Sequence, residues 1–334
     1  MKVKEPVVYA VLLVFALGFA YQTWTRDESA NAASGDVVLW EESTDAFVSA
    51  DYHAADRSVH VERRGTDDDA YLWGRVIRTR PTYRPIEGDS MVRVETVDTI
   101  EFVVGPNGDD LVEALATPRA LRDLGAPDSA LREAYGLADS TAQIAIRFRD
   151  GERSLTIGGS AYSSNDRYAL DPATGRGYVL PSETVALLED ADSRLPERRL
   201  HDFDRRDLVE VVVTAGGGER TLRRADGAGP GEEVWTAPDA PDRPDQTFAN
   251  FMLRLRRLSV NEYLPDADLS TLEPTLRIEY FGPDREPLGF FELFHRPGVE
   301  GEAAYVFRTE LTRVAVTTYG NMAEEVASDA AQLF

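Results

Sequence analysis

The sequence predicts an α+β protein in which an N-terminal transmembrane helix is followed by two similar modules of antiparallel β-hairpins with packed helices. Three observations predict this class. The run from Val7 to Tyr21 contains no charge, apolar and polar residues alternate around short turns in many stretches, and the second half repeats the order of the first. We expect a cytoplasmic stub and transmembrane anchor at residues 1–26, a linker at 27–36, a first module at 37–195 and a second at 196–334.

The N-terminal segment has the length of a membrane span. Counted from Pro6 to Thr25, one helix of about 20 residues crosses the ~30 Å hydrocarbon core of a bilayer. Lys2 and Lys4 precede it, which predicts a single-pass protein of the inner (cytoplasmic) membrane, with its N-terminus in the cytoplasm and its bulk on the periplasmic or outer side. The competing interpretation is a cleaved signal peptide, because Ala30-Asn31-Ala32 resembles a cleavage site.

The first module begins with three segments that are predicted to be strands because they are rich in β-branched and aromatic residues. These segments are residues 58–64, 71–80 and 91–105. A helix is predicted at about residues 109–124, interrupted by Pro118. Residues 144–159 alternate around Asp150-Gly151, the strongest short-range signal of a hairpin. A second hairpin at 166–181 and a helix at about 182–192 complete the module. The segment 75–104 is longer than its counterpart in the second module.

The second module repeats this plan from Leu208. A hairpin is turned by three glycines at residues 216–218, a short strand carries Trp235, and a helix is predicted at about residues 245–258. Residues 275–294 then match the hairpin at 144–159, and residues 302–330 match the hairpin and helix at 166–192. Tyr168 and Tyr305 take equivalent places. A repeat of roughly 130 residues is large enough for each copy to have its own core.

Charge and composition exclude several classes of protein. The formal charge of −23 repels nucleic acid, whose phosphates are bound mainly by Lys and Arg. The absence of cysteine excludes disulfides, thiol catalysis and thiolate metal sites. We therefore expect no nucleic-acid partner.

The sequence contains no recognisable set of catalytic, cofactor or metal residues. None of the four histidines has the spacing of a metal site. The stretch His201-Asp202-Phe203-Asp204 holds an imidazole and two carboxylates, but in an extended chain His201 and Phe203 point to one side and the carboxylates to the other. Nucleophile elbows and phosphate-binding glycine loops are absent. We expect no catalytic, cofactor-binding or metal-ligating residues, and we expect that the protein is not an enzyme.

Three phenylalanines form a candidate interface. Phe290, Phe291 and Phe294 lie in one predicted strand. Adjacent side chains of a strand point to opposite faces, so Phe290 and Phe291 cannot both face the same core. One of them is expected to face outward or into a protein contact.

Several short motifs, taken in order, resemble one protein family. They are Tyr135-Gly136-Leu137 before a hairpin, LTIGG after it, DRYAL with GRGYVLP, and RLPERRLHDFDRRDLVEVVV leading into VWTAP. This pattern resembles domain-of-unknown-function family 4340 over about residues 58–334. The resemblance implies a membrane-anchored envelope protein whose gene lies beside a gliding-motility type ABC transporter and its auxiliary membrane protein. It implies no catalytic residues.

These observations lead to a first hypothesis and two alternatives. The first is a non-catalytic, membrane-anchored envelope protein that binds other proteins, as an accessory or scaffold of an ABC-type transport or surface-assembly system. Its partners would be the membrane, through Val7 to Tyr21, and an ABC permease or auxiliary membrane protein. The second is a solute- or glycan-binding protein that uses the cleft between the modules. The third is a carboxylate-dependent hydrolase.

Overall fold

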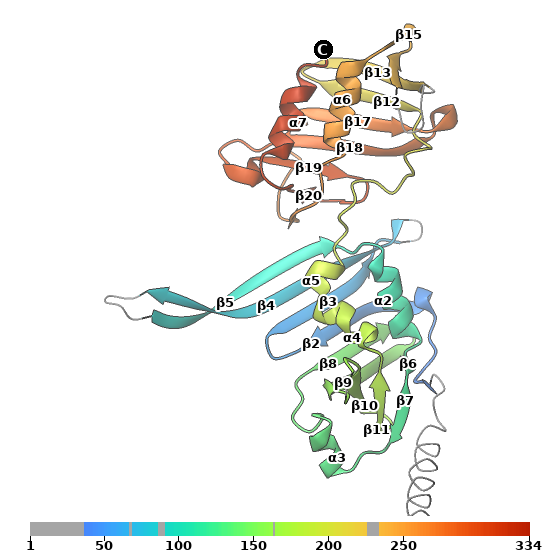
Figure 1. Cartoon of the computed structure of the whole chain (residues 1–334), viewed down its shortest axis with the longest axis vertical. Helices are drawn as coiled ribbons and strands as arrows, with labels where there is room; N and C mark the ends of the chain where they lie inside the picture. The colour runs from blue at the N-terminus through green and yellow to red at the C-terminus, as the bar shows by residue number, and fades with distance from the viewer. Residues whose placement is uncertain (1–36, 67–68, 86–90, 163, 226–233) are drawn as a thin grey trace, which may run out of the picture. The chain divides into compact units, whose positions relative to one another are not determined.

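The protein is built mainly from β-strands. The computed structural model describes residues 37–66, 69–85, 91–162, 164–225 and 234–334. Strands make up 44% and helices 21% of the structure, and most strands belong to two nine-stranded sheets (Figure 1). The prediction of an α+β class is therefore wrong. One reason is that residues 119–125, expected to continue a helix, instead form strands after Pro118, which cannot donate a helical hydrogen bond.

The predicted transmembrane helix is also corrected. No helix within the described residues is long and apolar enough to cross a membrane. The longest of these helices have 10 residues, or about 15 Å, half the thickness of a bilayer core. The prediction of a single-pass protein of the inner membrane is not upheld. Val7 to Tyr21, on which it rested, and the predicted linker at 27–36 lie outside the described residues.

The first sheet has the strand order β5-β4-β3-β2-β8-β9-β10-β11-β7. Its strands are β2 (Phe47–His53), β3 (Arg57–Arg64), β4 (Tyr71–Pro85), β5 (Met91–Val103), β7 (Arg122–Gly125), β8 (Gln143–Phe148), β9 (Gly151–Ser160), β10 (Arg167–Asp171) and β11 (Arg176–Leu180). The helices of this part are α2 (Asn107–Ala116), α3 (Ser129–Ala134), α4 (Ser182–Glu189) and α5 (Ala191–Arg194), with a 3-10 turn at Thr44–Ala46. A separate pair joins β1 (Val37–Val38) and β6 (Arg119–Ala120).

The hairpin β8–β9 shows how the sequence pattern builds this sheet. Ile144, Ile146 and Phe148 are buried, while the residues between them are exposed. Phe148 pairs with Gly151, so the chain turns at Arg149 and Asp150, and Gly151 is the first residue of β9. The alternation therefore places one face of β8 in the core.

The second sheet has the strand order β15-β14-β13-β12-β17-β18-β19-β20-β16. Its strands are β12 (Glu210–Ala215), β13 (Gly218–Ala225), β14 (Val234–Ala237), β15 (Ala240–Pro244), β16 (Tyr263–Leu264), β17 (Leu276–Phe281), β18 (Pro287–His295), β19 (Tyr305–Thr309) and β20 (Ala315–Val316). Its helices are α6 (Gln246–Leu255) and α7 (Met322–Ala330), with 3-10 turns at Pro283–Arg285 and Gly301–Ala304. All eight pairings are antiparallel.

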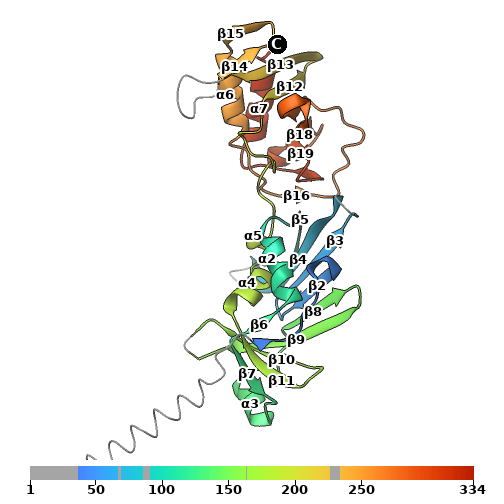
Figure 2. The same ribbon diagram turned by 90° about the vertical axis from the view of Figure 1, so that its right-hand side faces the viewer.

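Helices α6 and α7 pack against each other and cover the second sheet (Figure 2). Asp245 caps α6, because its Oδ1 accepts a hydrogen bond of 2.9 Å from the Phe248 N–H. The Phe248 ring then meets Trp235 of β14 edge to face at 5.3 Å. Both rings are buried, so this contact forms part of the core between the helix and the sheet.

The two sheets have the same order of elements along the chain. In each, four strands precede a helix, α2 or α6, and a later strand, β8 or β17, pairs with the first of the four. Tyr168 of β10 and Tyr305 of β19 occupy corresponding strands. The module boundaries at 37–195 and 196–334 stay predictions.

Candidate functional site

Strands β4 and β5 extend beyond the rest of their sheet. β3 pairs with β4 only as far as Arg78, whereas β4 and β5 continue from Thr79↔Val97 to Pro85↔Met91. Among the described residues, no third strand pairs with this part. We call residues 79–85 and 91–97 the β4–β5 ribbon, which projects from the sheet in Figure 1. A two-stranded ribbon without further packing is at best marginally stable in water.

One face of the ribbon carries three exposed apolar side chains beside Arg93 and Glu95. Tyr83, Met91 and Val97 are 60%, 61% and 62% exposed. Directly paired residues of an antiparallel ladder share a face. The pairs Tyr83↔Arg93 and Thr79↔Val97 therefore place all three apolar side chains on the same side. Exposed apolar side chains gathered on one face make the ribbon a candidate site of interaction.

The outer edge of β5 is long, and within the described residues no strand pairs with it. β5 has 13 residues and contains neither proline nor glycine. The corresponding edge of the second sheet is β15, which has five residues and includes Pro241 and Pro244. The remaining edges of the two nine-stranded sheets, β7 and β16, have four and two residues. Short strands and prolines are the usual means of blocking an edge. Among the described strands, β5 is the long edge that lacks them.

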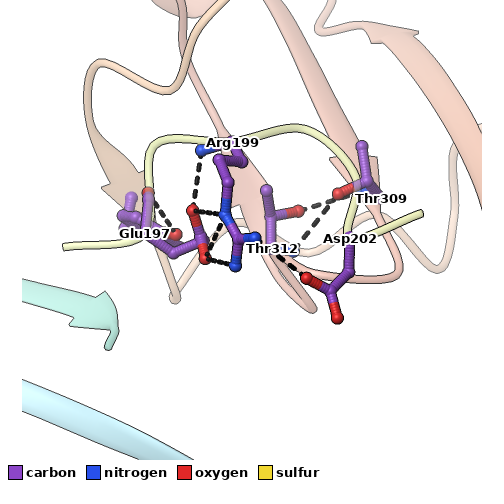
Figure 3. Close-up of polar contacts among 6 residues, drawn as sticks. Glu197, Arg199, Asp202, Thr309 and Thr312 are labelled. Atoms are coloured by element: carbon purple, nitrogen blue, oxygen red, sulfur yellow. Dashed lines mark hydrogen bonds and ion pairs between the residues drawn. The ribbon is translucent and has the colours of Figure 1, made fainter. Parts of the chain in front are cut away.

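A second candidate region surrounds residues 197–208, which we call the connecting segment. The buried Glu197 carboxylate accepts hydrogen bonds from the Arg199 N–H (2.8 Å), Nε (3.1 Å) and Nη2 (2.8 Å), and Arg199 also reaches Asp202 at 2.9 Å (Figure 3). The hydrogen bonds to Glu197 are the main reason that the pKa of Arg199 is raised. This network folds the segment onto itself and neutralises the charge of Arg199.

Contacts with the second sheet fix the connecting segment in place. The Tyr263 hydroxyl donates to the carbonyl oxygen of Glu197 at 2.9 Å. Nη1 of Arg198 donates to the carbonyl oxygens of Val260 at 2.9 Å and Asn261 at 2.7 Å. Because these partners follow α6 in the chain, the segment is held beside the end of that helix.

His201 joins the segment to the turn between β19 and β20. Its Nδ1 lies 2.8 Å from Oε1 of Glu310, and Oε2 of Glu310 accepts a hydrogen bond of 2.9 Å from the Phe290 N–H. Thr309 and Thr312 fix the turn that carries Glu310, since each backbone N–H donates to the other's hydroxyl, at 3.0 and 3.2 Å (Figure 3). Within the described part of the chain, Nε2 of His201 is buried without a hydrogen-bond partner.

Gly289 makes room for the Glu310 carboxylate. A Cβ atom at this position would lie 2.6 Å from Cδ and Oε2 of Glu310 and 2.7 Å from Oε1. Real Cβ contacts are not that short. The absence of a side chain at Gly289 thus allows Glu310 to reach Phe290 and His201 together.

A cavity of about 310 Å³ lies between the connecting segment, the end of α6 and β17. Leu208, Met252, Leu255 and Leu258 form its apolar lining and are buried. Its aromatic lining is Phe203, His201 and Tyr280, with His201 stacked on Phe203 at 4.9 Å and edge-on to Tyr280 at 4.6 Å. Burial is the main cause that raises the pKa of Tyr280 above its ordinary value. Arginines from the segment and α6 complete the lining.

The structure places the three predicted interface phenylalanines on both faces of β18. Phe291 is fully buried and stacks on Phe307 at 5.3 Å, and Phe294 is buried in the core with Val306. Phe290 is half-buried, with the Arg308 guanidinium 5.9 Å from its ring. Of the three, Phe290 alone has a partly exposed side chain to offer to a partner.

The stretch His201-Asp202-Phe203-Asp204 adopts the alternation expected of an extended chain. His201 and Phe203 stack on each other, whereas Asp202 and Asp204 bind Arg199 and Arg206. The pKa of Asp204 is lowered to about 2, first because the Arg206 side chain donates to it. The residue that does meet His201 is Glu310, more than 100 positions away, and no local motif indicated it.

Comparisons with known proteins return one match. A family model described as a domain of unknown function (DUF4340) matches residues 109–275, half of the 334-residue chain. It spans α2 to the residue before β17. No curated protein and no solved structure matches.

Proposed function

Because the chain belongs to the family of the domain of unknown function DUF4340, we propose that it is a non-catalytic protein that binds another protein through the β4–β5 ribbon. The resemblance of the chain to this family implies an accessory role rather than a reaction. The partner is a component of an ABC-type transport or surface-assembly system, and this identity rests on the family resemblance alone.

The ribbon carries the proposal. Its seven residue pairs have no third paired strand within the described residues, yet they continue the ladder of the sheet without a break. The cost of leaving Tyr83, Met91 and Val97 in water is relieved when a partner covers them. A partner strand added along β5 would also satisfy the backbone groups of its open edge.

The charge of the ribbon suggests what the partner presents. Residues 79–85 and 91–97 contain three arginines and one glutamate, in a chain with a formal charge of −23. An acidic and partly apolar strand is complementary to this surface. Electrostatic complementarity of this kind raises the association rate and favours the correct partner.

The test is co-purification of the tagged full-length protein with an ABC permease or ATPase from native cells, measured by quantitative mass spectrometry. The variants Tyr83→Ser and Val97→Ser should reduce recovery of the transporter components. Tyr162→Ser is the matched control, because Tyr162 is 93% exposed and follows β9 in the chain, outside the ribbon. Equal recovery with all three variants would exclude the ribbon as the binding surface, and recovery of the protein alone would exclude the proposed partner.

A further inference from the structure

The cavity beside the connecting segment has the size of a small-ligand site. Its volume of about 310 Å³ lies at the lower end of the ~300–1,000 Å³ typical of ligand pockets. Its lining residues come from the connecting segment, α6 with the turn after it, and β17. Because the connecting segment is bound to Val260, Tyr263 and Glu310 of the second module, these walls are held in position.

The apolar part of the lining calls for an apolar group on the ligand. Leu255 and Leu258 come from the α6 side, Leu208 from the segment, and Phe203 and Tyr280 supply aromatic rings. Removing such surface from water on binding is favourable by about 25 cal/mol per Å². A purely hydrophilic ion would leave this gain unused.

Arginines make up most of the polar part of the lining. The cavity is lined by Arg198, Arg199, Arg205, Arg256 and His201, and no Asp or Glu is among its described lining residues. This is unusual for a chain with a formal charge of −23. The C-terminal end of α6 contributes only about half a negative charge, which is less than the full positive charge of Arg198.

Arg198 keeps its charge available. Arg199 is neutralised by Glu197 and Asp202. Nη1 of Arg198, in contrast, donates to the carbonyl oxygens of Val260 and Asn261, which are neutral groups. These two bonds orient the guanidinium without cancelling its charge, and a planar guanidinium is well suited to a carboxylate.

We propose that this cavity binds a small carboxylate that carries an apolar or aromatic group, with the carboxylate directed to Arg198 and the apolar group against Phe203 and the leucines of the α6 side. The site lies within the second module and does not depend on the β4–β5 ribbon.

The test is isothermal titration of the full-length protein with 3-phenylpropionate, 3-phenylpropionamide and acetate. The carboxylate with the phenyl group should bind at least about tenfold more tightly than the amide, which lacks the charge, and than acetate, which lacks the ring. Equal binding of the amide and the carboxylate would overturn the role of the cationic wall. The absence of any binding of 3-phenylpropionate at about 1 mM would overturn the site.

Two variants locate the interaction. Arg198→Gln should weaken 3-phenylpropionate binding about tenfold. Arg206→Gln, on the same segment but 85% exposed and paired with Asp204, should leave it unchanged. Equal effects of the two substitutions would refute the assignment to Arg198. If Arg198→Gln lowers the melting temperature, Phe203→Ser replaces it as the test: it should weaken binding of 3-phenylpropionate but not of acetate, and unchanged binding would contradict the proposal.

Discussion

Replacing Gly289 by alanine should destabilise the second module through a carboxylate rather than through backbone strain. The added Cβ would lie 2.6 Å from Cδ of Glu310, the far end of a flexible side chain that can rotate away. In rotating, Glu310 loses its hydrogen bonds with Phe290 (2.9 Å) and His201 (2.8 Å). The cost of Gly289→Ala is therefore the loss of these two bonds.

The size of the effect follows from the partners. A hydrogen bond to a charged group contributes about 1.5–3 kcal/mol to stability. The side chain of Glu310 is 24% exposed, so water replaces part of what is lost. We expect a loss of about 2–3 kcal/mol in the free energy of unfolding, or a fall of roughly 5–10 °C in melting temperature for a domain of this size.

Thermal unfolding followed by circular dichroism measures this loss. Gly151→Ala is the control, because a Cβ at Gly151 has no atom within 4 Å, and its effect should stay within about 0.5 kcal/mol. The double variant Gly289→Ala/Glu310→Ala should lose less free energy of unfolding than the sum of the losses in the two single variants, since both substitutions remove the same hydrogen bonds. Strict additivity, or equal melting temperatures for Gly289→Ala and Gly151→Ala, would refute the reasoning.

Two further predictions concern the anchoring of the second module. Tyr263→Phe removes the hydroxyl that donates to the Glu197 carbonyl at 2.9 Å and should lower the free energy of unfolding in urea by about 1–2 kcal/mol, and an unchanged midpoint would argue against this anchor. Burial acts to raise the pKa of Asp245, but the Phe248 N–H and Arg220 outweigh it and lower the pKa below 3.8. Its stabilising effect is therefore present above pH 3.8 and lost as the pH falls through the lower folded value. The difference in stability between the wild type and Asp245→Asn should shrink between pH 7 and pH 3, and a constant difference would contradict this assignment.

The sequence was most informative about local pairing. Alternation predicted the hairpin at 144–159, which forms β8 and β9 with Ile144, Ile146 and Phe148 in the core. Helix lengths were overestimated, since apolar spacing continued past Pro118 although the chain there turns into β6 and β7. Apolar residues four apart are compatible with a helix and with short strands, so the period alone does not decide between them.

The two candidate sites could not be read from local pattern. The composition of the expanded segment at 75–104 predicted strands. Only the register shows that the pairing of β3 with β4 ends at Arg78 and leaves seven pairs of β4 and β5 without a third strand. The contact of His201 with Glu310 arises because the strand order brings the turn after β19 to the connecting segment. Such contacts depend on topology, which residue spacing does not encode.

The strand order of the second sheet leads us to expect a particular order of events in its folding. Strands β12 to β15 and β17 to β20 each form a block in which every strand pairs with its neighbour in the chain, so both blocks arise from local contacts. The blocks meet at one seam, the six pairs of β12 and β17, from Glu210↔Phe281 to Ala215↔Leu276. Closing the long loop between these strands carries a larger entropic cost than forming the hairpins, so we expect the seam to form after them. The backbone amides of the seam should therefore gain protection from exchange later in refolding than those within the hairpins.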